Sequence, residues 1–300
     1  MNNKNSTDTT VAYSNEIFGR KKSLLKEVWE RFLKNKPAIV CLFIIALLVI
    51  CAVFAEQIAP YGPDGQDLTR KLQLPSLKFP FGTDEYGRDI LSRIIYGARP
   101  SLLVAAVSVT FSCIAGTFIG CVAGYYGNIV DNSFMRLIDI IQAIPSMMLA
   151  ISIAAMLGSG LGNVMIAVGI GTIPNYARLV RASILSLKEQ EFIEAARSVG
   201  AGNIHIIFRH ILPNCLAPII VQATMSVGAA ITAAAGLSFI GLGIMPPTPE
   251  WGSMLSSGRA LMRRYWHVVT FPGLMIMMTV FSFNILGDGL RDAMDPRLKK

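Results

Sequence analysis

Long apolar stretches alternate with short charged segments along this chain. Five windows contain no Asp, Glu, Lys or Arg: 37–55, 100–130, 140–177, 210–249 and 265–287. A helix needs roughly 20 apolar residues to cross the hydrocarbon core of a bilayer, and each window is about that long or longer. The pattern therefore predicts an integral membrane protein.

The windows divide into helices at their turn residues. Window 140–177 is too long for one span, and residues 158–163 (GSGLGN) form a turn cluster inside it. We therefore expect an all-α membrane protein with six transmembrane helices near 38–55, 101–126, 134–157, 163–185, 213–242 and 268–287.

Composition and charge narrow the class of protein. Of the 300 residues, 53% are hydrophobic and 15% are charged, whereas a typical soluble domain is about 25% charged. The net charge of +8 comes from basic patches beside the apolar windows, as topology control requires, so we expect no nucleic-acid partner. The five cysteines are odd in number and form no CxxC motif, so we expect buried thiols and not disulfides or a metal site.

The basic residues also predict the orientation in the membrane. With the N-terminus inside, 18 of the 27 Lys and Arg fall in inner segments and nine in outer segments. Cytoplasmic segments are enriched in positive charge. We therefore expect both termini on the cytoplasmic side of the membrane.

The first outer loop has two expected parts. Residues 56–81 are rich in Pro and Gly and should be irregular. In residues 81–102, Ile90, Leu91, Ile94 and Ile95 share one helical face, which predicts an amphipathic helix on the membrane surface with Asp89 and Arg93 as an i,i+4 ion pair. A solvated connector is the alternative.

The helix cores lack the groups that an ion-driven carrier or an enzyme uses. No Asp, Glu, Lys, Arg or His lies in the core of an expected span to relay protons or bind cations. The sequence contains no GxxxxGK[ST], HExxH or GxSxG motif. We expect no catalytic, cofactor-binding or metal-binding residues, and any transport would take its energy from a partner; a self-sufficient channel or carrier is the competing class.

The longest inner segment, 189–213, predicts two short helices. In the first, Phe192, Ala195, Ala196 and Val199 make an apolar stripe, and Gly200 ends the helix. In the second, Asn203 is the expected N-cap, with an apolar face of Ile204, Ile207, Phe208 and Ile211. The segment could dock on another protein or pack only on its own bundle.

The same segment carries a resemblance to a known family. Glu194-Ala195-Ala196, then Gly200, then Leu212-Pro213 resembles the EAA loop of prokaryotic ABC importer permeases. Further stretches are similar to the peptide and nickel branch of that superfamily, and to its second permease subunit: FGTDEYGRDILSR (81–93), GARPSLLV (97–104), IPSMMLAI (144–151), YARLVRASILSLKEQEFIEAAR (176–197), FRHILPN (208–214), LSFIGLGIMPPTPEWG (237–252) and FNILGDGLRDAMDPRL (283–298).

The resemblance implies a location in the cytoplasmic (inner) membrane of a prokaryotic cell, together with a fold, partners and site residues. The fold would be a type I ABC importer permease bundle with a cytoplasmic coupling helix. The partners would be a homologous second permease, two cytoplasmic ATPases that bind ATP, and an extracytoplasmic binding protein. The ATPases would dock on Glu194, Ala195, Ala196, Arg197 and Gly200.

We expect the chain to divide into four parts. The parts would be a cytoplasmic N-terminal segment 1–37, a first helix with its outer loop 38–98, a core permease domain 99–290 that includes coupling loop 186–213, and a cytoplasmic tail 291–300.

Polar residues inside the apolar helices are candidates for the translocation pathway: Gln142, Gln222, Ser226, Thr232 and Asn284. Each could equally form hydrogen bonds across the bundle. The cargo would be di- or oligopeptides, with nickel or another metal chelate as the alternative.

Overall fold

The structure, a computed structural model, describes residues 24–295. Residues 1–23 of the expected N-terminal segment and residues 296–300 of the expected tail lie outside this range. The described residues form α-helices joined by short links and one longer loop. The elements are α2 (Leu24–Phe32), α3 (Lys36–Val53), α4 (Ala55–Ile58), a 3₁₀ turn η1 (Leu68–Arg70), α5 (Ile90–Tyr126), α6 (Asn128–Ala143), α7 (Ser146–Leu157), α8 (Leu161–Leu187), α9 (Glu191–Ser198), α10 (Asn203–Ile206), a π-helical segment η2 (Ile207–Ile211), α11 (Leu212–Phe239), α12 (Trp251–Gly258), a 3₁₀ turn η3 (Arg259–Leu261) and α13 (His267–Met294).

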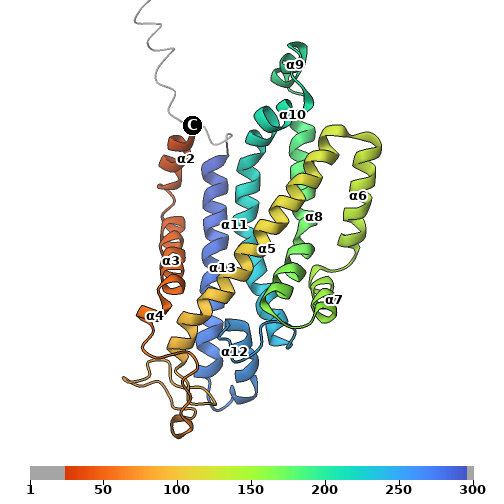
Figure 1. Cartoon of the computed structure of the whole chain (residues 1–300). Helices are drawn as coiled ribbons and strands as arrows, with labels where there is room; N and C mark the ends of the chain where they lie inside the picture. Colours follow the sequence, from red (N-terminus) through yellow and green to blue (C-terminus); the bar gives the residue numbers. More distant parts are fainter. Residues whose placement is uncertain (1–23, 296–300) are drawn as a thin grey trace, which may run out of the picture.

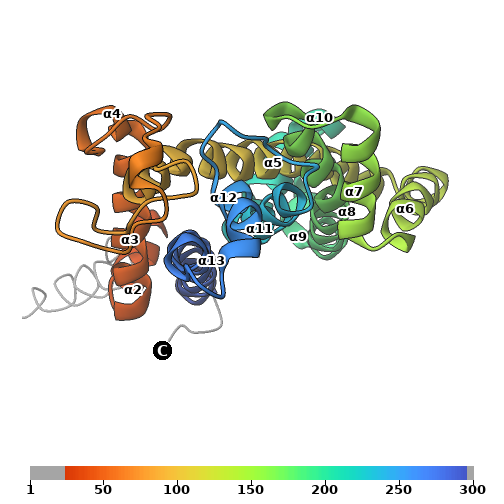
Figure 2. The ribbon, with the colours of Figure 1, turned by 90° about the horizontal axis from the view of Figure 1, so that it is seen from below.

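The chain runs the length of the bundle in α3, α5, α6 with α7, α8, α11 and α13 (Figure 1). One end carries α2, α9, α10 and the last turn of α13; the other carries α4, α12 and the loop before α5. Seen along the bundle, α3 and α6 lie at opposite edges, and α11 lies between α13 and α8 (Figure 2).

Each of the six expected spans has a helical counterpart, but the counterparts differ in length and in how apolar they are. Four helical stretches are long and apolar enough to cross a membrane: Lys36–Val53, Ile90–Tyr126, Asn203–Phe239 and His267–Met294. The bent pair α6 and α7 counts as a fifth at most. Helix α8 has 27 residues, which is about 40 Å of helix, so it is long enough to cross a membrane. It is not among the four apolar stretches, because its polar residues lower its mean hydropathy.

The expectation of one continuous helix over 134–157 is wrong. Helices α6 and α7 are separate and bend by 85° at their junction. The cause is Pro145, which lacks a backbone N–H and disfavours helical geometry for the residue before it. Ile144 accordingly has extended torsion angles, φ −95° and ψ 127°.

The expectation of a separate surface helix before the second span is also wrong. Helix α5 runs unbroken for 37 residues through Pro100. Its first apolar side chains, Ile90, Ile94 and Ile95, are buried. Ile90 and Ile94 share a cluster with Met254 of α12 and Val268 of α13, so protein and not lipid covers this face.

The expected ion pair between Asp89 and Arg93 does not form. The Asp89 carboxylate instead caps α5, accepting a hydrogen bond from the Ser92 backbone N–H at 2.8 Å. The Arg93 guanidinium lies 3.7 Å from Asp64 and 3.8 Å from Asp84. Asp89 acts as the N-cap instead of pairing with Arg93, because the backbone N–H groups in the first turn of a helix have no partner within the helix and a carboxylate accepts hydrogen bonds from them.

Helices α5 and α8 form the scaffold of the bundle. A Cβ on Gly116 would overlap Tyr176, and one on Gly120 would overlap the Ala177 carbonyl oxygen. The two backbones can approach this closely because small residues face the contact. Around it lies the largest buried cluster, to which α7 and α11 also contribute.

Candidate functional site

Residues 188–202 connect α8 to α10 and contain helix α9; we call this segment the α9 loop, and its residues 199–202 the α9–α10 turn. The α9 loop projects from the end of the bundle that also carries α2 (Figure 1). The helix ends where expected: Gly200 has φ +84°, its N–H donates to the Arg197 carbonyl oxygen at 2.9 Å, and the Ala201 N–H donates to Ala196. A positive φ strongly favours glycine. Gly200 thus turns the chain from α9 toward α10.

One face of α9 packs on its own bundle. Ile193 is fully buried and Ala196 is 9% exposed. Both belong to a cluster with Tyr125, Val180, Ile184, Ile206, Ile211, Cys215 and Ile219. This cluster draws on α5, α8 and α11, so α9 is held against the ends of three long helices.

A hydrogen bond fixes the turn after α9. The Tyr125 hydroxyl donates to the Asn203 side-chain oxygen at 2.8 Å, and the Arg197 guanidinium lies 5.9 Å from the centre of the Tyr125 ring. The expectation that Asn203 caps α10 is therefore wrong. Gly202 takes the cap position without a side-chain hydrogen bond, and the Asn203 amide is engaged by Tyr125.

The expected apolar stripe of α9 is divided by the structure. Ala196 faces the bundle, whereas Ala195 is exposed, together with Phe192 at 39% and Val199 at 84%. The next turn exposes Ile204 at 71% and Phe208 at 66%. Among them lie the exposed side chains of Glu191, Glu194 and Arg197. Exposed apolar side chains therefore lie on the same segment as exposed charges, which makes it a candidate docking surface.

Helix α10 is continuous with the next span. Residues 203–239 form one helical stretch, in which the π-helical segment Ile207–Ile211 joins α10 to α11. The sequence predicted a separate second helix before a new span at Pro213. Instead, any force on the α9–α10 turn acts directly on the long helix α11.

The pathway candidates lie in two places. On α11, the Gln222 amide nitrogen donates to Ser226 Oγ at 3.2 Å, and Thr232 Oγ1 donates to the Gly228 carbonyl oxygen at 3.0 Å. Asn284 of α13 lies opposite, its amide oxygen 3.2 Å from where a Cβ on Gly228 would be. Gln142, by contrast, is exposed on α6, on the far side of α8 from α11 (Figures 1 and 2).

An open groove runs beside these α11 residues, at the end of the bundle where α9 lies. Its cavity volume is about 530 Å³, and its lining comes from α8, α11, α13 and the residue after it: Leu179, Asn214, Ala217, Pro218, Val221, Gln222, Met225, Arg291, Met294 and Asp295. Of the sequence candidates only Gln222 lines it. Arg291 and Asn214 carry no special sequence signal, because terminal positions of apolar helices commonly hold polar residues.

Two ion pairs that the sequence did not predict join α6 to α8. Asp131 accepts two hydrogen bonds from the Arg181 guanidinium, at 2.5 and 2.6 Å. Asp139 accepts one from Arg178 at 2.5 Å. Their partners are 50 and 39 residues apart in the chain, so no local spacing could reveal them.

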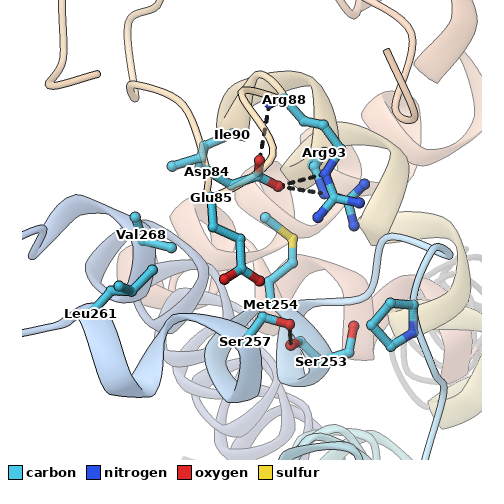
Figure 3. A pocket seen from close by; sticks show the side chains of 11 residues that line it. Asp84, Glu85, Arg88, Ile90, Arg93, Ser253, Met254, Ser257, Leu261 and Val268 are labelled. Atoms are coloured by element: carbon cyan, nitrogen blue, oxygen red, sulfur yellow. Dashed lines mark hydrogen bonds and ion pairs between the residues drawn. The ribbon is translucent and has the colours of Figure 1, made fainter. Parts of the chain in front are cut away.

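The opposite end of the bundle carries a compact charged cluster (Figure 3). The Asp84 carboxylate lies between two guanidinium groups, 2.6 Å from Arg88 and 3.8 Å from Arg93. Arg93 also donates to the carbonyl oxygens of Pro63 and Pro247. The adjoining cavity measures about 20 Å³, room for about one water, so this cluster holds loops together and offers no ligand pocket.

Nearby, Glu250 caps α12. Its two carboxylate oxygens accept hydrogen bonds from the backbone N–H groups of Gly252 and Ser253 at 2.8 and 2.7 Å. Burial raises the pKa of this carboxyl above its ordinary value, although the two N–H groups act in the opposite direction.

Two family models match the sequence. The model described as binding-protein-dependent transport system inner membrane component covers residues 116–300. The model described as N-terminal TM domain of oligopeptide transport permease C covers residues 23–75.

Curated relatives are similar over nearly the whole chain. A di/tripeptide transport system permease protein DppC of Pseudomonas aeruginosa is 46% identical over 305 residues, covering 100% of this chain and 98% of the relative. A dipeptide transport system permease protein DppC of Alkalihalophilus pseudofirmus is 49% identical, covering 91% and 90%. A glutathione transport system permease protein GsiD of Escherichia coli is 48% identical, also covering 91% and 90%.

Solved structures share the fold. The inward-facing MetNI methionine ABC transporter matches with a TM-score of 0.55 at 19% identity, over 68% of this chain and 96% of that chain. An amino acid ABC transporter with histidines matches with a TM-score of 0.51 at 17% identity, over 67% and 94%.

Proposed function

Because the chain belongs to the family of binding-protein-dependent transport system inner membrane components, we propose that it is the permease subunit of an ATP-driven importer for di- and oligopeptides. It is a multi-pass protein of the inner membrane. The observation that carries the proposal is 46% identity, over the full length, to a permease named for di- and tripeptides. Nickel or another metal chelate is not favoured as cargo, because the similar permeases are named for dipeptides and glutathione.

Two cytoplasmic ATPases drive the permease from its α9 loop. The docking residues are Glu194, Ala195, Ala196, Arg197 and Gly200. Support comes from the exposed apolar and charged side chains of α9 and from its buried anchors Ile193 and Ala196. Ala196 faces the bundle, so it positions the loop while Glu194, Ala195 and Arg197 offer the contact.

ATP binding and hydrolysis act on the pathway through α11. Since α10 and α11 form one helical stretch, displacement of the docked α9–α10 turn tilts α11 as a rigid body, a common form of conformational switching. To be driven between two conformations, the permease needs only to make different contacts with its partners in each of them. ATP belongs to the partner subunits, and this chain binds no cofactor.

The α9 end of the bundle faces the cytoplasm. Support comes from the excess of Lys and Arg in the expected inner segments of the sequence and from the shared position of α2, α9 and the last turn of α13 at that end of the bundle (Figure 1). An extracytoplasmic binding protein delivers peptides to the opposite end, which carries α12 and the loop before α5. A homologous second permease completes the pathway.

The test is reconstitution of this chain with the partner permease, the two ATPases and the binding protein. We expect dipeptide-loaded binding protein to stimulate ATP hydrolysis several-fold over the ligand-free binding protein. Stimulation by a nickel chelate with no response to any dipeptide would contradict the cargo. Failure of the ATPases to associate with the permease would contradict the coupling.

A further inference from the structure

The groove on α11 has the size and position of a small-ligand site. Its volume of about 530 Å³ lies within the range of roughly 300–1,000 Å³ typical of such sites. It opens at the end of the bundle that carries α9, the end we assign to the cytoplasm. A peptide leaving the pathway on that side would pass it.

The floor of the groove is one face of α11. Asn214, Pro218, Val221, Gln222 and Met225 recur at helical spacing and all line it. Leu179 of α8 lines one wall and Met294 of α13 the other.

Three polar side chains in the groove have unused hydrogen-bonding capacity. Within residues 24–295, the Arg291 guanidinium has no hydrogen bond or ion pair. The Gln222 and Asn214 amide nitrogens donate to Ser226 Oγ and to the His210 carbonyl oxygen. The amide oxygens of both residues accept no hydrogen bond in that same part of the chain. Asp295, the other charged residue of the lining, is already engaged in an interaction of its own.

This combination matches the chemistry of a short peptide. Arginine presents planar donors that suit a carboxylate, and amide oxygens accept hydrogen bonds from ammonium and N–H groups. Val221, Met225 and Met294 supply apolar surface for side chains of varied shape, and Met adapts well to such variation. Peptides differ in their side chains but share a terminal carboxylate. A guanidinium that has no ion pair of its own can bind this shared group in each of them.

We propose that this groove is an exit site that binds the peptide before its release into the cytoplasm. The C-terminal carboxylate lies on Arg291, and the N–H groups lie on the Gln222 and Asn214 amide oxygens. The inference rests on the proposed function, since it assigns a site on this chain to the same cargo.

The experiment uses the complete transporter in inside-out membrane vesicles, which expose the cytoplasmic side. The native cysteines Cys41, Cys51, Cys113, Cys121 and Cys215 are replaced by alanine. The substitution Val221→Cys then places one thiol in the groove. The rate of its modification by a water-soluble maleimide is measured with and without millimolar Ala-Phe dipeptide. Ser186→Cys, exposed on α8 but outside the groove, is the matched control.

We expect Ala-Phe to slow modification at Val221→Cys several-fold and to leave Ser186→Cys unchanged. Adding Arg291→Gln should abolish the protection, Arg291→Lys should restore part of it, and the C-terminally amidated dipeptide should protect less. A thiol at 221 that reacts equally with and without peptide would overturn the inference. So would a thiol that never reacts because a partner subunit covers the groove, and so would protection that Arg291→Gln leaves intact.

A second measurement separates this inference from the proposed function. In proteoliposomes, Arg291→Gln should lower the turnover of peptide uptake several-fold without changing the KM for peptide-loaded binding protein, because release follows delivery. Lys34→Gln, which removes an exposed charge outside the groove, should leave both values unchanged. Absence of peptide uptake by the wild-type transporter would refute the proposed function; normal uptake with an unaffected Arg291→Gln would refute the exit site alone.

Discussion

Single residues decide how the α9 loop is shaped and held. Gly200 could be predicted as a turn residue, because glycine after an amphipathic stretch commonly ends a helix. Ile193 could not be predicted as the buried anchor. The stripe through Phe192, Ala195 and Val199 satisfies the same periodicity, and only the packing against α5, α8 and α11 shows which face turns inward.

Gly200→Ala tests the turn. An L-residue in left-handed backbone geometry costs about 1–2 kcal/mol, and no neighbour would touch the added methyl group. We expect weaker ATPase retention on purification and slower transport, with normal membrane insertion. Gly202→Ala is the control, because Gly202 has φ −69° and equally open surroundings. Equal effects of the two substitutions would contradict the assignment.

Tyr125→Phe tests the hydrogen bond that holds the turn after α9. Losing the bond to Asn203 should cost about 1 kcal/mol and increase the opening of residues 191–206. Amide hydrogen exchange over this segment measures the opening. Tyr126→Phe, at an exposed neighbouring ring, should leave exchange unchanged; faster exchange in that control would show that the ring environment and not the bond matters.

Glu250, at the end of the bundle that carries α12, should make the stability of the folded protein depend on pH. Its pKa is raised in the folded protein by burial, so the folded state binds a proton more tightly than the unfolded state does. Stability from this group is greatest below the ordinary carboxyl pKa and is lost as the pH rises through the raised value. In Glu250→Gln, thermal unfolding in detergent should lose that part of the pH dependence. A pH profile identical to wild type would contradict it.

At the scale of elements, apolar windows predicted where helices lie but not how they are joined. Pro145 breaks the third span, whereas Pro100 is accommodated inside α5. The presence of a proline alone does not distinguish the two outcomes, and tertiary packing decides between a continuous helix and a break. The buried start of α5 was misassigned to the membrane surface for a related reason: an amphipathic pattern does not say whether lipid or protein covers its apolar face.

Glu194→Lys tests α9 as the docking element. Glu194 is exposed on α9, so reversing its charge should leave the fold intact and weaken electrostatic complementarity with the ATPases. We expect loss of most ATPase on co-purification with unchanged membrane insertion. Glu189→Lys, outside α9 and also exposed, should have a smaller effect. Full ATPase retention by Glu194→Lys would contradict docking through this face.

At the scale of the whole molecule, the number of passes through the bundle could be predicted from the sequence, because it depends on the length of the apolar windows. The expected passes through the bundle all have counterparts. The spatial positions of the polar pathway candidates could be predicted least. Gln142 is as polar as Gln222, but only the fold separates the two, placing Gln222 in the α11 groove and Gln142 on a remote edge.

The most direct measurement is uptake of a radiolabelled dipeptide into proteoliposomes containing this chain, the partner permease and the ATPases, with ATP trapped inside and binding protein outside. We expect accumulation above the external concentration that requires ATP, binding protein and residues 194–200 of this chain. Equal uptake without ATP, or by a transporter lacking residues 194–200, would contradict an importer driven through the α9 loop.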